Sequence, residues 1–137
     1  MSKAVDDLLR RACASHSLAI ERALVEIDVT PAQFAAMECL WEEPGLSGSE
    51  IARRERLTAP TSSVIVANLE RKGLLVRRLL EKRGRAQHLE LTPLGREKVV
   101  AGAKIVEVVR RRLTADLKPE TQLAVMSWLE RLMDFDV

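Results

Sequence analysis

The 137-residue sequence is poor in aromatic side chains, with two Trp, two Phe and no Tyr. Proteins that hold single-stranded nucleic acid stack its bases on several aromatic rings, so this composition excludes such a platform. Apolar runs are short, and none approaches the roughly 18 residues of a membrane-spanning helix. The first residues lead into an amphipathic stretch and not into the apolar core of a signal peptide. We therefore expect a cytoplasmic protein with no membrane partner.

Histidine and cysteine are equally scarce. His16 and His88 lie far apart and in no metal-ligand spacing, while Cys13 and Cys39 form neither a CxxC pair nor a disulfide framework. No glycine-rich loop of the kind that cradles phosphates is present. Catalysis needs a convergent set of nucleophile, base, paired carboxylates or metal ligands, and the sequence shows none. We expect no enzyme activity, no metal and no cofactor, and a reducing environment for both thiols.

The net charge of +2 hides an uneven distribution. Residues 50–96 contain eleven Lys and Arg against five Glu, a net charge of +6, so the rest of the chain carries −4. A basic middle between acidic flanks is typical of a module that binds a polyanion such as DNA. A solvated charged face would have the same composition, and charge alone does not separate the two.

Periodicity and capping signals predict two helices in the first third of the chain. Apolar residues recur at steps of three and four from Val5 to Ile27 and predict the first helix. Thr30 and Gln33 form a capping box around Pro31, which predicts the start of the second helix. This helix should end at residues 43–45 and turn four residues toward the core: Phe34, Met37, Leu40 and Trp41.

Two short helices come next. Ser47 and Glu50 form the capping box of one, which should end near Arg56. Thr58 caps the other, which should stop at Gly73. Their short connection is typical of a helix-turn-helix.

A hairpin and two more helices complete the predicted order. Residues 74–80 are rich in strand formers, 81–85 form a charged turn with one glycine, and 87–91 alternate polar and apolar residues. Thr92 and Pro93 then start a long helix that reaches about Leu117, and Pro119 starts the last helix.

The predicted fold class is mainly α (α+β), a winged helix-turn-helix with N- and C-terminal dimerisation helices. We expect one domain over residues 1–137, with a DNA-binding winged helix-turn-helix at 31–91 and dimerisation helices at 5–27 and 94–135. The terminal helices carry more apolar residues than one small winged domain can bury, which predicts a homodimer. Within this arrangement, Ser47–Leu91 is the part expected to read double-stranded DNA.

Five strings of the sequence, taken in order and spacing, resemble the multiple-antibiotic-resistance regulator (MarR) family. The resemblance implies a two-fold dimer held by its terminal helices, with a recognition helix in the major groove and a wing tip near the minor groove. It also implies a repressor on a pseudo-palindromic operator, released by a small lipophilic or phenolic effector or by cysteine oxidation. The strings are Thr30-Pro31-Ala32-Gln33-Phe34, Leu46-Ser47-Gly48-Ser49-Glu50-Ile51-Ala52, Leu57-Thr58-Ala59-Pro60-Thr61, Leu69-Glu70-Arg71-Lys72-Gly73-Leu74-Leu75 and Leu89-Glu90-Leu91-Thr92-Pro93-Leu94-Gly95.

The sequence departs from the family pattern at two places. The wing motif Asp-x-Arg is common in the family, but here an arginine, Arg83, replaces the aspartate while Arg85 is kept. In the recognition helix, many members carry Arg after a Ser, whereas this chain has Val64 after Ser63. Both departures make the operator sequence hard to transfer from relatives.

The candidate DNA-binding residues fall into three groups. Hydroxyls near the start of the recognition helix suit phosphates and base edges, although they also serve as caps. Two wing arginines suit the narrow minor groove, although a solvated turn would also hold them. The remaining arginines suit phosphates, and some are expected only to decorate the surface. The groups are Thr58, Thr61, Ser62 and Ser63; Arg83 and Arg85; and Arg53, Arg54, Arg77 and Arg78.

The sequence contains fewer signals for residues that sense an effector or an oxidant. Cys13 and Cys39 are either redox-sensing thiols or small buried residues, and an exposed, electropositive thiol would favour sensing. His16, Met37 and Trp41 either line an effector pocket, as the family resemblance implies, or simply pack. The other function considered is a winged helix that binds protein in place of DNA, against which the basic wing argues.

Overall fold

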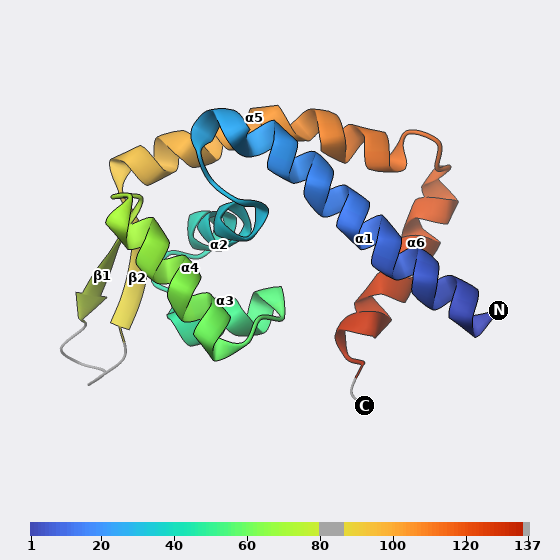
Figure 1. The fold of residues 1–137 in the computed structure, drawn as a ribbon, viewed down its shortest axis with the longest axis horizontal. Coiled ribbons are helices and arrows are strands. Elements are labelled where there is room, and N and C mark those ends of the chain that lie inside the picture. The colour runs from blue at the N-terminus through green and yellow to red at the C-terminus, as the bar shows by residue number, and fades with distance from the viewer. Residues whose placement is uncertain (80–86, 136–137) are drawn as a thin grey trace. The chain divides into compact units, whose positions relative to one another are not determined.

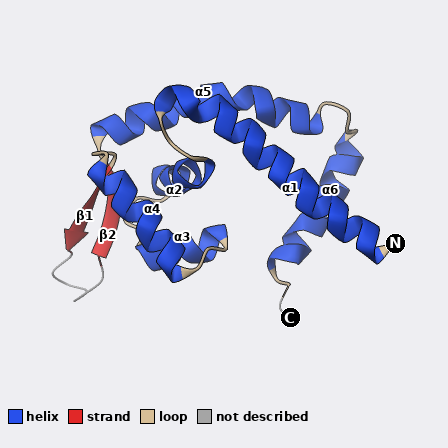
Figure 2. Cartoon of the chain, in the orientation of Figure 1, coloured by secondary structure: helices blue, strands red, loops and turns tan. Residues whose placement is uncertain are grey.

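The computed structural model describes residues 1–79 and 87–135 and consists mainly of helices, with one two-stranded antiparallel sheet (Figures 1 and 2). The predicted fold class is confirmed. Residue contacts divide the chain into two compact units, Met1–Val106 and Glu107–Val137, which are described separately below. The elements are α1 Ser2–Leu24, the 3-10 helix η1 Val25–Ile27, α2 Pro31–Glu42, α3 Gly48–Glu55, α4 Ala59–Arg71, β1 Leu75–Leu79, β2 Gln87–Leu91, α5 Pro93–Thr114 and α6 Pro119–Met133.

Both predicted capping boxes are present. The Thr30 hydroxyl accepts the Gln33 N–H at 3.1 Å, and the Gln33 side-chain carbonyl accepts the Thr30 N–H at 3.1 Å. Ser47 and Glu50 make the equivalent pair at 3.1 and 3.3 Å. Each pair satisfies two N–H groups that a helix start would otherwise leave without partners, which is why α2 and α3 begin where the sequence predicts.

The first helix ends earlier than predicted. The α-helical part stops at Leu24, and residues 25–27 tighten into a 3-10 turn. Asp28 then adopts a left-handed conformation with φ of 54° and donates its N–H to the Val25 carbonyl at 3.2 Å. The tightened turn lets the chain reverse within a few residues and enter α2.

The core of the first unit is built from α1, α2, α3, α4, the hairpin and the first part of α5. The prediction for α2 is correct for Phe34, Met37 and Leu40, which are 2%, 0% and 1% exposed, and wrong for Trp41, which is 47% exposed. Leu40 already occupies the inward position in that turn, and the next residue is rotated about 100° around the helix, away from the core. Other fully buried side chains from these elements are Leu24, Ile51, Leu69, Leu74, Leu75 and Leu89.

The hairpin pairs Leu75 with Leu91 and Leu79 with Gln87. Its second strand also bonds to the connection between α2 and α3, because Leu89 donates to the Leu46 carbonyl and accepts from the Gly45 N–H, both at 2.9 Å. These two bonds anchor the hairpin to the connection that follows α2. Leu80, expected at the end of the first strand, lies outside the described residues.

The second unit contains the end of α5 and the whole of α6. The α5 helix ends at Thr114, three residues before the predicted limit, and the side chain of Gln122 donates to the Leu117 carbonyl at 3.1 Å. No residue of α6 is buried. Three of its large apolar side chains, Leu123, Met126 and Met133, are more than half exposed. Among the described residues, no helix combines the length and the apolar character of a membrane span.

Candidate nucleic-acid interface

The helices α3 and α4 lie against each other in the first unit and form the helix-turn-helix (Figure 1). The buried stripe of α4 consists of Ser62, Ile65, Val66 and Leu69. These positions recur at steps of three and four, so they share one helix face, and the opposite face is left to solvent.

Ser62 belongs to the buried stripe. Its side chain is 2% exposed, and its hydroxyl donates to the Gly48 carbonyl at 2.8 Å, across the interface with α3. Sequence reasoning placed this hydroxyl with the DNA-contacting groups. The structure places it in the packing between the two helices, so we leave it out of the candidate interface.

The other three hydroxyls are exposed at the start of α4. The Thr58 hydroxyl caps the helix by accepting the Thr61 N–H at 3.3 Å, and it donates to the Thr61 hydroxyl at 2.9 Å. Ser63 lies two residues further on and is exposed. A helix start with exposed hydroxyls and a positive dipole end is suited to a phosphate.

The four candidate arginines in the described part of the chain are all exposed. Arg77 pairs with Glu70 at 3.2 Å, Arg78 pairs with Glu90 at 2.8 Å, and Arg54 pairs with Glu43. Exposed ion pairs contribute about 0 to 1 kcal/mol, so a phosphate can replace the carboxylate at little cost. Arg53 has no side-chain partner among the described residues. Arg83 and Arg85 lie outside the described residues, and their roles stay predictions.

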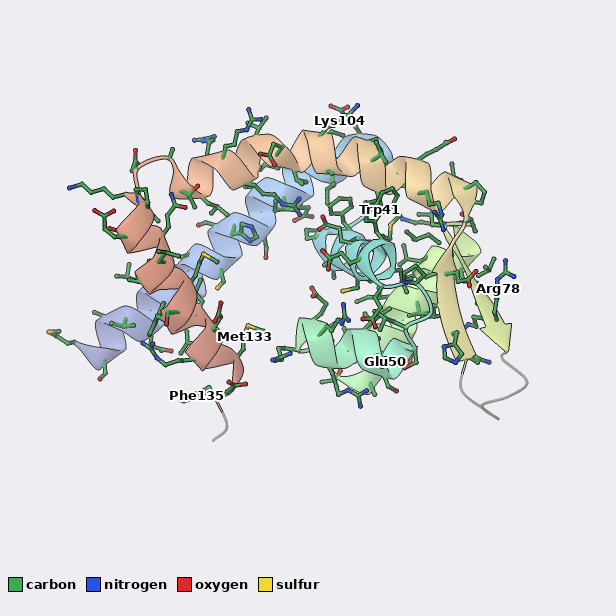
Figure 3. All side chains as sticks on the ribbon, turned by 180° about the vertical axis from the view of Figure 1, so that it is seen from behind. Trp41, Glu50, Arg78, Lys104, Met133 and Phe135 are labelled. Atoms are coloured by element: carbon green, nitrogen blue, oxygen red, sulfur yellow. The ribbon has the colours of Figure 1, made fainter. Side chains whose placement is uncertain are left out.

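A polar hollow of about 430 Å³ lies between the hairpin, the α2–α3 connection and α3. His88 of β2 lines it together with Glu50 and Arg78, which are labelled in Figure 3. The Nδ1 of His88 lies 2.6 Å from the Gly45 carbonyl, which can only accept, so this nitrogen carries the proton. The His88 ring therefore adds a third link, a side-chain one, between the wing and the helix-turn-helix.

The predicted effector residues lie in different surroundings. His16 is exposed on α1, Met37 is fully buried, and Trp41 lines a hollow. That hollow, of about 340 Å³, lies between α2 and α5 and is also lined by Val99, Val100, Ala103, Lys104, Glu38 and Glu42. Trp41 and Lys104 are labelled in Figure 3.

Cys39 lies in an environment opposite to that of a redox sensor. Burial, and then the negative charge of Glu55, raise the pKa of its thiol from 9.0 to about 11. The sulfur lies 3.7 Å from a Glu55 carboxylate oxygen, to which the thiol donates. Reactive thiols need a lowered pKa and exposure. Cys13 is exposed on α1. In the described ranges, no group of three or more His, Cys, Asp or Glu residues is placed to hold a metal ion.

Known proteins resemble this chain in sequence and in fold. The family model described as "MarR family" matches residues 29–85. The HTH-type transcriptional repressors Mb2911 of Mycobacterium bovis and Rv2887 of Mycobacterium tuberculosis are each 28% identical over 113 residues, which cover 82% of this chain and 81% of theirs.

Two solved structures of DNA complexes show the same fold. That of Staphylococcus aureus MepR with DNA has a TM-score of 0.84 at 25% identity and covers 93% of this chain and 92% of its own. That of the transcriptional repressor CouR, bound to a 23-mer DNA duplex, has a TM-score of 0.81 at 29% identity, with coverages of 90% and 88%. The matched segment, the relatives and the winged helix-turn-helix agree, and the chain is similar in sequence and fold to the MarR family of transcriptional regulators.

Proposed function

We propose that the protein binds double-stranded DNA as a homodimer and represses transcription from a pseudo-palindromic operator. The observation that carries the proposal is the disposition of α4. This helix buries Ser62, Ile65 and Leu69, is bonded to α3 through Ser62, and presents its opposite face and its hydroxyl-rich start to solvent. In helix-turn-helix proteins the second helix enters the major groove with its N-terminal residues on the bases. The repressors named above support the choice of repression over activation.

The positive charges around α4 fit the same ligand. Arg53 and Arg54 lie at the end of α3, and Arg77 and Arg78 lie on the first strand of the wing. Arginines on both sides of a recognition helix suit the two phosphate backbones that border a groove, where they set affinity while groups on the helix set sequence choice. The wing arginines Arg83 and Arg85 extend this basic surface in the sequence, and we assign them to the minor groove.

A second copy of the chain is the partner we assign to the uncovered apolar faces. In α6, Leu123, Met126 and Met133 are 67%, 54% and 53% exposed, and in α1, Leu8 is 66% exposed. Burial of such residues in a partner stabilises by roughly 25 cal/mol per Å² of apolar area. A two-fold dimer would place its recognition helices on half-sites about one helical turn, roughly 10 bp, apart.

We also propose that the protein is located in the cytoplasm, where it reaches its DNA target. We further propose that the hollow beside Trp41 binds a small lipophilic or phenolic effector. The exposed indole face and the valines of α5 supply apolar contact, and Lys104 supplies a charge for a phenolate or carboxylate. Of the three residues that the sequence pointed to, this assignment keeps Trp41 alone.

Binding to DNA is tested by titrating a labelled duplex with the protein at several salt concentrations. Log Kd should rise steeply with log salt, and Arg53→Gln should lower the slope by about 0.9, as expected for one lost phosphate contact. Arg85→Ala should weaken binding to a selected operator by about 1–3 kcal/mol. A protein-binding winged helix would instead leave the duplex unbound at every salt concentration.

A further inference from the structure

The row of α4 farthest from the core is apolar up to Arg71, its last position. Pro60, Val64 and Ala67 follow one another at steps of four and three, opposite the buried stripe of the helix. Val64 is at the centre of this row and is 60% exposed. Within α4, no charged side chain precedes Glu70.

The fold does not account for a valine at this position. A β-branched residue is a poorer helix former than alanine, and an exposed side chain gains little from packing in return. The inward positions beside it, Ile65 and Val66, are 7% and 3% exposed and already fill the contact with the rest of the unit. Val64 is therefore available for a ligand.

The polar groups that flank this row are mostly engaged with one another. The hydroxyls of Thr58 and Thr61 share a hydrogen bond, and Arg71 donates to the Asn68 side-chain oxygen at 2.8 Å. The charge-assisted bidentate contact that Arg makes with guanine is not available from residues 59–69, because none of them is charged. The centre of the row, Val64, therefore presents methyl groups to a base pair.

We propose that Val64 is a specificity-determining residue that packs against the C5-methyl group of a thymine in each operator half-site. The inference rests on the proposed binding of duplex DNA. In the major groove, the thymine methyl is the one apolar group that a base pair presents, and small apolar side chains recognise it by contact. A valine in the middle of the exposed row thus selects an A·T pair at that position.

The test begins with selection of duplexes from a random library by the full-length protein. Each thymine of the enriched duplex is then replaced in turn by deoxyuridine, which removes the methyl group and leaves base pairing intact. At one thymine in each half-site, the replacement should weaken binding of the wild-type protein roughly four-fold, the value of one buried methyl group. Replacement in both half-sites should weaken it roughly 15-fold if the sites are independent.

Val64→Ala supplies the second half of the test. Alanine is the better helix former, so the variant should fold, and because it lacks both γ-methyl groups it should lose most of the preference for the thymine duplex over the deoxyuridine duplex. Val25→Ala is the matched control, because Val25 is also an exposed valine, at 71%, but lies on η1. This control should keep the full preference for the thymine duplex.

The possible failures are distinct. If duplexes are enriched but no deoxyuridine weakens binding, or if Val64→Ala keeps the same penalty as the wild type, the role of Val64 is overturned while DNA binding stands. If the library yields no enriched duplex at all, the proposed function falls, and the inference falls with it.

Discussion

The hydroxyl of Ser62 donates a hydrogen bond to the backbone carbonyl of Gly48 across 2.8 Å, from inside α4 to the first residue of α3. The neighbouring contacts between these helices are apolar, with Ile51 and Ala52 buried on α3 and Ile65 and Val66 on α4. A directional bond within an apolar contact sets how one helix is turned against the other. Ser62 therefore influences how the outer face of α4 is presented, without lying on that face.

Ser62→Ala should lower the free energy of unfolding by about 0.5–1.5 kcal/mol, because the hydrogen bond to the Gly48 carbonyl is lost. Ser63→Ala is the matched control. Because the Ser63 side chain is exposed, the free energy of unfolding of this variant should differ from that of the wild type by less than about 0.5 kcal/mol. Urea unfolding followed by circular dichroism measures both. Duplex titration should show the larger direct loss of affinity for Ser63→Ala, and the reverse order would return Ser62 to the DNA surface.

Gly95→Ala should destabilise the protein by about 1–3 kcal/mol or more, because overpacked positions with no room to relax force the backbone to move. A Cβ at Gly95 would collide with the backbone carbonyl of Leu74 and meet a Leu91 methyl at 3.3 Å. Gly48→Ala is the control, since a Cβ there meets only side-chain atoms at 3.9 Å. Thermal unfolding of the two variants should separate them clearly, and equal melting temperatures would show that α5 does not approach the wing as closely as described.

Cys39 should resist alkylation at neutral pH. In a Cys13→Ser variant, iodoacetamide should react slowly with the native protein at pH 8 and quickly once the chain is unfolded in urea. The reason is that the thiolate is the reactive form, and the pKa of Cys39 is raised to about 11. Fast reaction of the native protein at pH 8 would contradict the burial of this thiol.

The same thiol should make stability depend on alkaline pH. Because its pKa is higher in the folded chain than the ordinary value of 9.0, Cys39 stabilises the fold below about pH 9, and this contribution is lost between pH 9 and about 11. Between pH 8 and pH 10.5, the free energy of unfolding measured in urea should therefore fall less for Cys13→Ser/Cys39→Ala than for Cys13→Ser. Equal losses would assign the alkaline effect to other groups, such as the lysines.

The double variant Leu123→Glu/Met126→Glu should convert the protein to a monomer. Both side chains are more than half exposed in α6, where no residue is buried, so the substitutions should leave the fold of the single chain intact. Sedimentation velocity measures the mass, and circular dichroism checks the helix content. Val25→Glu, at an exposed position of η1, should stay dimeric, and a monomeric wild type would contradict the proposed dimer.

Sequence reasoning succeeded where the signal is local. Thr30 with Gln33 and Ser47 with Glu50 satisfy N–H groups three residues away, and the start of each helix follows from those residues alone. The alternation of residues 87–91 likewise predicted β2 with its observed bounds. The end of the first helix was predicted less well, because the 3-10 turn at 25–27 depends on where the chain must go next.

Which way a side chain faces was harder to predict. Ser62 and Ser63 are the same residue type in neighbouring positions, yet one is buried against α3 and the other is exposed. Trp41 was expected in the core and is half exposed, while Val64, which the sequence marked only as a departure from the family pattern, is left uncovered by the structure. No pattern within α4 predicts the exposure of Val64, which follows from the packing of the whole unit.

The sequence by itself determined the order of the elements, the helix starts and the basic character of residues 50–96, because caps, turns and charge act within a few residues or simply add up. Only the tertiary structure decided which hydroxyls face outward, which arginines already hold a carboxylate, and that the exposed row of α4 is apolar. Those properties arise from contacts between α2, α3, α4 and the hairpin, segments that the sequence keeps apart and the burial of a shared core brings together.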